Sequence, residues 1–143
     1  MAGHTYRDLD AWQKSMDLVE EIYRITKDFP REEQFGLTNQ IRRSATSVPA
    51  NIAEGQGRLH RAEFLRLLSV ARGSLTETET HLQIAVRLGY IDRDSAKEAW
   101  ALSQRVGRQL TGLIKSLEGK NGGNSIRISE TTESYGIEDT DLQ

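Results

Sequence analysis

Residues 61–88 read RAEFLRLLSVARGSLTETETHLQIAVRL, and this stretch decides the fold. Its apolar and small residues recur at steps of three or four that average 3.5. That spacing is typical of one buried stripe on a helix that packs against other helices. The stripe consists of Phe64, Leu68, Ala71, Leu75, Thr78, Leu82 and Ala85. We therefore predict a long helix over residues 61–88.

A first periodic segment precedes this helix, at residues 9–28. Asp8 stands where an N-cap belongs, because its carboxylate can accept hydrogen bonds from the free amides of the first turn. Phe29-Pro30 ends the segment, since the residue before a proline disfavours the helical region. The predicted stripe consists of Leu9, Trp12, Met16, Val19 and Tyr23, flanked by Ile22 and Ile25.

A second segment covers residues 37–55, with Thr38 as a plausible cap. Pro49 lies inside it and removes one backbone hydrogen bond, so we expect the helix to bend there without breaking. Gly55 and Gly57 then end the helix. Its stripe consists of Leu37, Ile41, Ala45, Val48 and Ile52.

The last segment, at residues 94–118, follows Gly89-Tyr90 and is capped by Asp92 or Asp94. Short connections make consecutive helices antiparallel neighbours, so residues 1–118 are predicted to form an all-α, up-down-up-down antiparallel four-helix bundle. Residues 119–143 carry a net charge of −3 and many small polar residues. We expect them to form a disordered acidic tail. The stripe of the last helix consists of Ala99, Leu102, Val106, Leu110, Leu113 and Leu117.

Positive charge concentrates in residues 42–72, which carry a net charge of +4. Fourteen of the 19 cations in the chain are arginines, the side chain favoured for gripping phosphates, although an ordinary solvated helix surface also explains them. We expect Lys115 to lie at the same end of the bundle as the turn that follows Gly57. The candidate nucleic-acid-binding residues are Arg42, Arg43, Arg58, Arg61, Arg66 and Arg72.

Catalytic patterns are missing from the sequence. There is no cysteine, and His4, His60 and His81 lack the Glu-x-x-His spacing of di-iron bundles. No Gly-x-Ser-x-Gly or phosphate-binding glycine loop is present. We expect no enzyme activity, no cofactor and no metal site. No apolar run is long enough to span a bilayer, and we expect a cytoplasmic protein.

A second line of residues runs beside the apolar stripe of the helix at 37–55. Small or hydrogen-bonding side chains of this kind let another backbone approach closely. They predict either a hydrogen-bonded contact within the chain or a subunit interface between bundles, and the sequence leaves both open. The candidate interface residues are Gln40, Ser44, Ser47, Asn51 and Glu54, joined by Gly73 and Ser74 from the next helix.

Several short motifs are distributed along residues 6–118. They are Asp8-Leu9-x-x-Trp12-Gln13-Lys14, Gln40-Ile41-Arg42-Arg43-Ser44-Ala45, Asn51-Ile52-Ala53-Glu54-Gly55, Glu63-Phe64-Leu65 and Ala71-x-Gly73-Ser74-x-x-Glu77. Together they resemble a bacterial family first noticed as proteins encoded within intervening sequences of large-subunit ribosomal RNA genes. One departure from the family pattern is His60, where a serine-type cap is expected. Accessory proteins of diversity-generating retroelements are more distant relatives.

The resemblance implies a small bundle that assembles as a ring-like homopentamer. It also implies association with RNA, and a reverse transcriptase or another protein as a further partner. Two function hypotheses follow. The chain is an RNA-associated binding module that uses its arginines on phosphates, or it is a scaffolding homo-oligomer that binds a protein partner and no nucleic acid.

Overall fold

The computed structural model describes residues 5–119, and this part of the chain contains four long helices and no strand. The long helices are α1 (Asp10–Thr26), α2 (Leu37–Gln56), α3 (Arg61–Arg87) and α4 (Arg93–Gly119). Two short 3₁₀ helices, η1 (Tyr6–Asp8) and η2 (Arg31–Glu33), precede α1 and α2. The all-α prediction is confirmed, and the four predicted helices lie within about two residues of their observed limits. Residue 119 ends α4, and the tail prediction for residues 120–143 lies outside the described residues.

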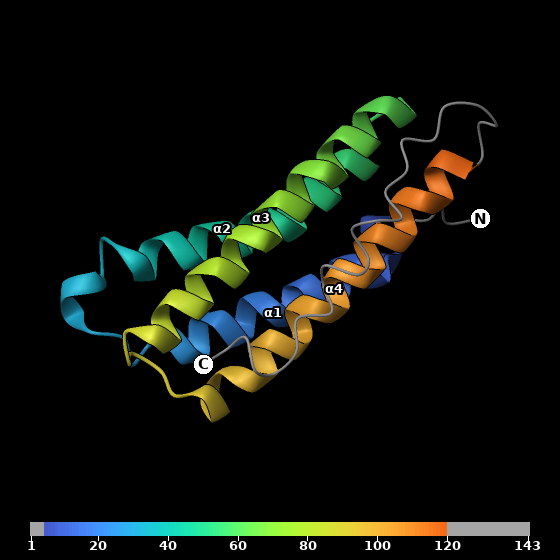
Figure 1. The fold of residues 1–143 in the computed structure, drawn as a ribbon. Helices are drawn as coiled ribbons and strands as arrows, with labels where there is room; N and C mark the ends of the chain where they lie inside the picture. The colour runs from blue at the N-terminus through green and yellow to red at the C-terminus, as the bar shows by residue number, and fades with distance from the viewer. Residues whose placement is uncertain (1–4, 120–143) are drawn as a thin grey trace.

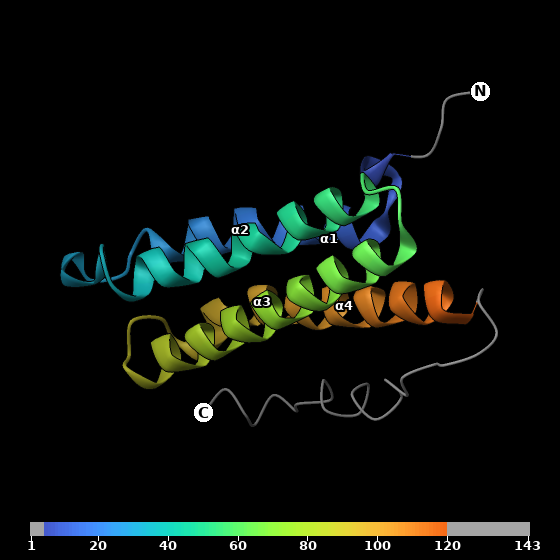
Figure 2. The same ribbon diagram turned by 90° about the horizontal axis from the view of Figure 1, so that it is seen from above.

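Each helix runs antiparallel to the one before it, and α4 returns to pack against α1 (Figure 1). The helices therefore form an up-down-up-down bundle, and the view from above shows the same order (Figure 2). The short helix η1, the α2–α3 turn and the end of α4 all lie at one end of the bundle (Figures 1 and 2). The opposite end holds the α1–α2 and α3–α4 connections.

The core is apolar, and α3 supplies it with the stripe that its sequence spacing predicts. Leu68, Ala71, Leu75, Leu82 and Ala85 are fully or almost fully buried. They pack in one continuous cluster with apolar residues of the other three helices. Burial of such a stripe removes about 25 cal/mol of unfavourable hydration free energy for each Å² of apolar surface.

The predicted stripe of α1 is wrong by one position. The side chains that enter the core are Ala11, Ser15, Leu18, Ile22 and Ile25. Trp12, Met16, Val19 and Tyr23 repeat with the same spacing one residue later, so they lie on the flank of the helix that adjoins α2. These four remain partly or largely accessible to solvent.

Two predicted helix caps are also wrong. Asp8 does not cap α1: its carboxylate accepts from the Thr5 backbone amide (3.0 Å) and closes a capping box on η1. Thr38 is buried within α2, and Glu33 instead accepts from the Leu37 amide (3.3 Å). Between the two candidates for α4, Asp92 is the cap, because it accepts from the Ser95 amide at 2.7 Å.

The turn that ends α3 depends on Gly89, which has a φ of +76°. The Tyr90 amide donates to the Ala85 carbonyl and the Gly89 amide to the Val86 carbonyl, the pattern of a Schellman motif. The Tyr90 hydroxyl then donates to Glu33 (3.0 Å), which joins this turn to the one before α2. The hydrogen bond to Glu33 raises the pKa of Tyr90.

Candidate nucleic-acid and subunit interfaces

Arg42 is held between α1 and α2. Its guanidinium carbon lies 4.5 Å from the centroid of the Tyr23 ring, and its Nε donates to the Thr26 hydroxyl at 2.8 Å. A planar cation stacked on an aromatic face stabilises the packing of the two helices. This arginine of the predicted nucleic-acid surface therefore has a structural role.

Two further arginines of that set are neutralised by carboxylates of their own segment. Arg58 pairs with Glu54 at 2.6 Å, and Arg66 pairs with Glu63 at 3.2 Å. The hydrogen bond and charge of Glu54 raise the pKa of Arg58. An approaching phosphate would have to compete with a carboxylate at each of these two positions.

The remaining three arginines are placed differently. Arg43 is exposed on the outer side of α2, whereas Arg61 and Arg72 are half-buried on α3. One terminal guanidinium nitrogen of Arg61 and one of Arg72 are buried without a hydrogen-bond partner. These two side chains are three helical turns apart, so they project from the same side of α3.

That side of α3 faces α4, because Gln104 of α4 contacts Glu79 two turns beyond Arg72. The antiparallel register then places Arg72 opposite Thr111, between the exposed Arg108 and Lys115. We call Arg61, Arg72, Arg108 and Lys115 the α3–α4 basic face. The ion pairs found within residues 5–119 include none of these four cations.

Arg108 was missing from the sequence-based set. The signal was present, since Arg108 and Lys115 are seven residues apart and share one side of a helix. Lys115 is four residues from the end of α4, and this end of α4 lies at the same end of the bundle as the α2–α3 turn, as the topology predicted (Figure 2). The predicted arginines thus occupy several sides of the bundle, and only Arg61 and Arg72 share one.

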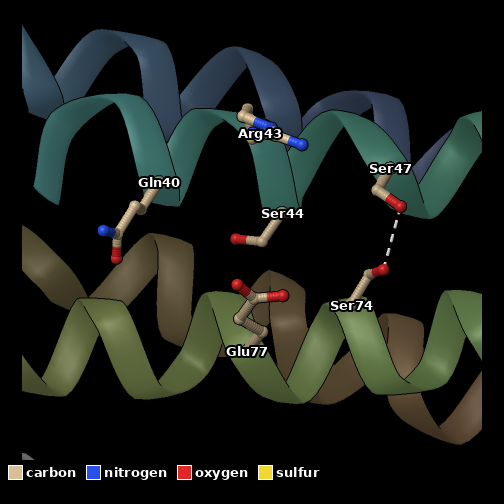
Figure 3. A pocket seen from close by; sticks show the side chains of 6 residues that line it. All are labelled: Gln40, Arg43, Ser44, Ser47, Ser74 and Glu77. Atoms are coloured by element: carbon tan, nitrogen blue, oxygen red, sulfur yellow. Dashed lines mark hydrogen bonds between the residues drawn. The ribbon is translucent and has the colours of Figure 1, made fainter. Parts of the chain in front are cut away.

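The predicted subunit line is largely a contact within the chain, between α2 and α3. The Thr78 hydroxyl donates to the Ser44 hydroxyl (2.8 Å), and Ser44 is buried. Ser47 and Ser74 share a hydrogen bond of 2.9 Å, as Figure 3 shows. Asn51 donates to the carbonyl and the hydroxyl of Ser47 (2.8 and 2.9 Å). Small hydroxyl side chains therefore let the two helices approach closely.

The outer edge of this contact remains open. A shallow polar pocket of about 280 Å³ lies between α2 and α3, and side chains from both helices extend into it (Figure 3). It is lined by Gln40, Arg43, Ser44, Ser47, Ser74 and Glu77. Among the predicted interface residues, Gln40, Glu54 and Gly73 are exposed at least in part, and Glu54 is paired with Arg58.

Apolar side chains border this pocket on the solvent side of α3. Val70 is 42% exposed and Ile84 39% exposed, and both share a side of the helix with Glu77. A Cβ added to Gly73 on the same side would meet no atom within 4 Å. We call Val70, Gly73, Glu77 and Ile84 the outer α3 face.

A second apolar surface lies between α1 and α2, where the misassigned stripe of α1 meets the flank of Pro49. Met16 is 37% exposed there, and the ring of Trp12 packs edge-on against Tyr6. The hollow has a volume of about 580 Å³. We call it the α1–α2 groove; it is lined by Tyr6, Trp12, Met16, Val19, Thr46, Pro49, Ala50, Ala53 and Glu54.

Acidic and histidine side chains do not gather into a metal site in the described part of the chain. Within residues 5–119, no group of three or more His, Asp or Glu side chains is placed to hold a metal ion. Glu77 and His81 contact each other at 3.3 Å on the surface of α3. No helix among these residues is long and apolar enough to cross a membrane.

Comparison with known proteins identifies the family. Residues 7–112 match the family model described as 23S rRNA-intervening sequence protein. Among solved structures, the chain is similar to a protein of unknown function from the S23 ribosomal protein family of Bacteroides thetaiotaomicron. The two share 30% identity with a TM-score of 0.66, over 73% of this chain and 98% of that one. A search of curated proteins finds no match. The family model covers most of the chain, and the chain therefore belongs to the 23S rRNA-intervening sequence protein family.

Proposed function

We propose that the protein is a non-enzymatic, homo-oligomeric binding module of the cytoplasm that associates with RNA. The α3–α4 basic face carries the interaction. Its cations contact the phosphate backbone, so recognition tolerates different sequences and depends steeply on salt.

The observation that supports this function is the absence of carboxylate partners for Arg61, Arg72, Arg108 and Lys115 among the ion pairs of residues 5–119. A cation without a carboxylate partner can bind an anion without first breaking an ion pair. Arg61 and Arg72 each have one buried guanidinium nitrogen without an acceptor, and each side chain would have to turn outward to donate that nitrogen to a phosphate oxygen. A family described by its ribosomal RNA context is consistent with an RNA ligand.

Four cations make a weak site, so repetition in an oligomer is part of the proposal. Each copy adds the same patch, and a long RNA that spans several patches gains avidity. We expect dissociation constants in the micromolar range or weaker at physiological salt for one patch, as for other contacts dominated by the backbone.

Anisotropy titrations of labelled single-stranded and duplex RNA oligonucleotides test this function. Replacement of Arg72, Arg108 and Lys115 by Ala should weaken binding to every RNA alike. It should also reduce the slope of log K against log salt by about 0.7–0.9 for each phosphate that the variant no longer neutralises.

The matched control replaces Arg58 and Arg66, two cations that already have carboxylate partners. That variant loses two positive charges from other faces of the bundle, against three in the test variant, and should bind RNA nearly as well as the unchanged protein. Equal reductions of affinity in both variants would refute the α3–α4 basic face as the site. No binding by the unchanged oligomer, even at low salt, would refute an RNA function.

For the assembly, we propose that the outer α3 face of one copy packs into the α1–α2 groove of the next. The two surfaces lie on different sides of the chain, so the contact is heterologous and repeats around a ring. Partly exposed apolar side chains on both surfaces would gain from burial. A pentamer is the expected ring size, from the family resemblance.

The second candidate function is a scaffolding homo-oligomer that binds a protein and no nucleic acid. The α1–α2 groove favours it, because Trp12 and Met16 are of the kinds enriched at protein interfaces. The RNA titrations distinguish the two functions, since a scaffold would show no salt-dependent binding.

A further inference from the structure

One ionisable side chain is buried in the bundle without a counter-charge. Glu79 of α3 is only 4% exposed and faces α4. Gln104 of α4 is 8% exposed, and its Nε2 lies 3.4 Å from Glu79 Oε1. Burial of an ionised carboxylate is costly unless cations or several hydrogen-bond donors surround it.

The donors around Glu79 are too few for an ionised carboxylate. Ser103 lies beside it and can donate a hydrogen bond, but its one hydroxyl proton is shared with the Trp100 carbonyl, which lies 2.7 Å from the Ser103 hydroxyl oxygen. The other donor is the Gln104 amide, at the long distance of 3.4 Å, and the ion pairs found within residues 5–119 do not include Glu79. Gln104 Oε1, meanwhile, is buried and has no hydrogen-bond partner.

A protonated carboxyl resolves both shortages. A carboxylic acid and a primary amide are complementary, because the acid donates its O–H to the amide oxygen while the amide N–H donates to the acid carbonyl. We infer that Glu79 is protonated in the folded chain at mildly acidic pH and forms this two-bond pair with Gln104, which joins α3 to α4.

The surroundings of Glu79 agree with this assignment. Desolvation raises the pKa of Glu79 from 4.5 to about 7, and Ser103 acts in the opposite direction. No ionised group of any helix contributes to that shift. On α3 itself, the nearest titratable neighbours, Glu77 and His81, contact each other. Across the interface, the α4 groups beside Glu79 are the neutral Ser103 and Gln104. The cations of the same side, Arg72 two turns away on α3 and Arg108 one turn beyond Gln104, are not among the causes of the shift.

Glu21 of α1 is a second buried carboxylate, and it has a cation beside it. It is 7% exposed, similar to Glu79, but Arg24 binds it with two guanidinium nitrogens. The hydrogen bond and charge of Glu21 raise the pKa of Arg24. The ion pairs found within residues 5–119 give Glu79 no such cation, so Glu21 is the matched control for a substitution at Glu79.

The consequence is a pH-sensitive contact between α3 and α4. Between pH 4.5 and about 7 the folded chain holds a proton that the unfolded chain has released, so stability falls as pH rises through this window. Above about pH 7 the folded chain has released the proton as well, and this source of pH dependence ends. The full difference in pKa corresponds to a change on the order of 100-fold in the unfolding constant.

The test compares urea unfolding of the full chain across pH for three proteins: unchanged, Glu79→Gln and Glu21→Gln. Glutamine keeps the shape of the protonated acid, so Glu79→Gln should flatten the profile from pH 5 to 8 and be the more stable protein at pH 8. The stability of Glu21→Gln should fall with rising pH as that of the unchanged protein does. If the stability of Glu79→Gln falls with pH in parallel with that of the unchanged protein, the inference is wrong.

Infrared spectroscopy of the unchanged protein gives a result that does not depend on a variant's folding. At about pH 6, exposed carboxyls are ionised, and a protonated buried carboxyl should contribute its own C=O stretching band. The band should disappear as the pH rises above about 8. A spectrum without that band at about pH 6 would overturn the assignment.

Discussion

Gly55 of α2 lies directly against α3. A Cβ at this position would lie 2.9 Å from Phe64 Cδ1 and 3.1 Å from Leu67 Cβ. The alanine variant, Gly55→Ala, must therefore displace Phe64 and Leu67 of α3, at a cost of about 1–3 kcal/mol. Urea unfolding measures this cost.

Gly112 supplies the control for that measurement. It lies within α4, and a Cβ there would meet nothing within 4 Å. Gly112→Ala should therefore stabilise the protein by up to about 1 kcal/mol through helix propensity. Equal effects of the two substitutions would show that crowding at Gly55 is not what constrains it.

Substitutions at Arg42 and Arg108 test which arginine stabilises the fold and which one binds RNA. Arg42→Ala removes the contact with Tyr23 and the hydrogen bond to Thr26, so it should lower the free energy of unfolding by about 1–2 kcal/mol and leave RNA affinity unchanged. Arg108→Ala should do the reverse, with unchanged stability and weaker RNA binding. Unfolding curves and RNA titrations of both variants check the pair. An Arg42→Ala variant that keeps full stability but no longer binds RNA would contradict the assignment.

At the scale of the helix, α4 depends on Asp92 for its start. A hydrogen bond from the Ser95 backbone amide is the largest cause that lowers the pKa of Asp92. The ionised cap therefore stabilises the fold above the ordinary pKa of an aspartate, and this contribution is lost as pH falls through the lowered value.

Two substitutions at Asp92 distinguish the contribution of the capping hydrogen bond from that of the negative charge. Asp92→Asn keeps a good cap but cannot titrate, so it should lose the acid-dependent part of stability and keep the rest. Asp92→Ala should lower the melting temperature at neutral pH as well. Thermal unfolding from about pH 3 to 7 provides the measurement, and equal profiles for both variants would argue against a capping role.

Helix positions and the bundle topology were predictable, because three-and-four spacing and short connections specify them. Which face of α1 is buried was not predictable, since Leu18 and Ile22 repeat with the same spacing as Trp12, Met16 and Val19, one residue earlier. When two apolar stripes lie side by side on a helix, their spacing predicts the helix but does not tell which stripe faces the core. Packing against α2, α3 and α4 decides which stripe is buried.

The candidate sites were harder to predict for a related reason. The pairing of Glu54 with Arg58 is readable from a spacing of four residues. The stacking of Arg42 on Tyr23 is not, because it joins side chains from two different helices. Similarly, small residues such as Ser44 and Ser47 indicate a close contact without telling whether the other helix belongs to the same chain.

For the whole molecule, the heterologous contact makes a specific prediction. Met16→Arg in the groove, or Val70→Arg on the outer α3 face, should each dissociate the oligomer to a species near 16.1 kDa, because each would bury an unpaired charge. Light scattering measures the masses. A single 16.1 kDa species for the unchanged protein at micromolar concentration would refute assembly.

Mixing the two variants tests the pairing of the surfaces. Met16→Arg keeps an intact outer α3 face, and Val70→Arg keeps an intact groove, so the mixture can form one contact and no more. It should therefore yield a heterodimer of twice the mass. A mixture that stays monomeric would show that these two surfaces do not bind each other.

The short helix η1 and the end of α4 lie at the same end of the bundle as the α2–α3 turn. The helices could therefore be connected in a different order along the chain and still pack in the same arrangement. A short linker could join the end of α4 to residue 5, while new termini open beside the fully exposed Leu59. Such a circular permutant would move the start and the end of translation to the α2–α3 turn and leave the four packed helices in place.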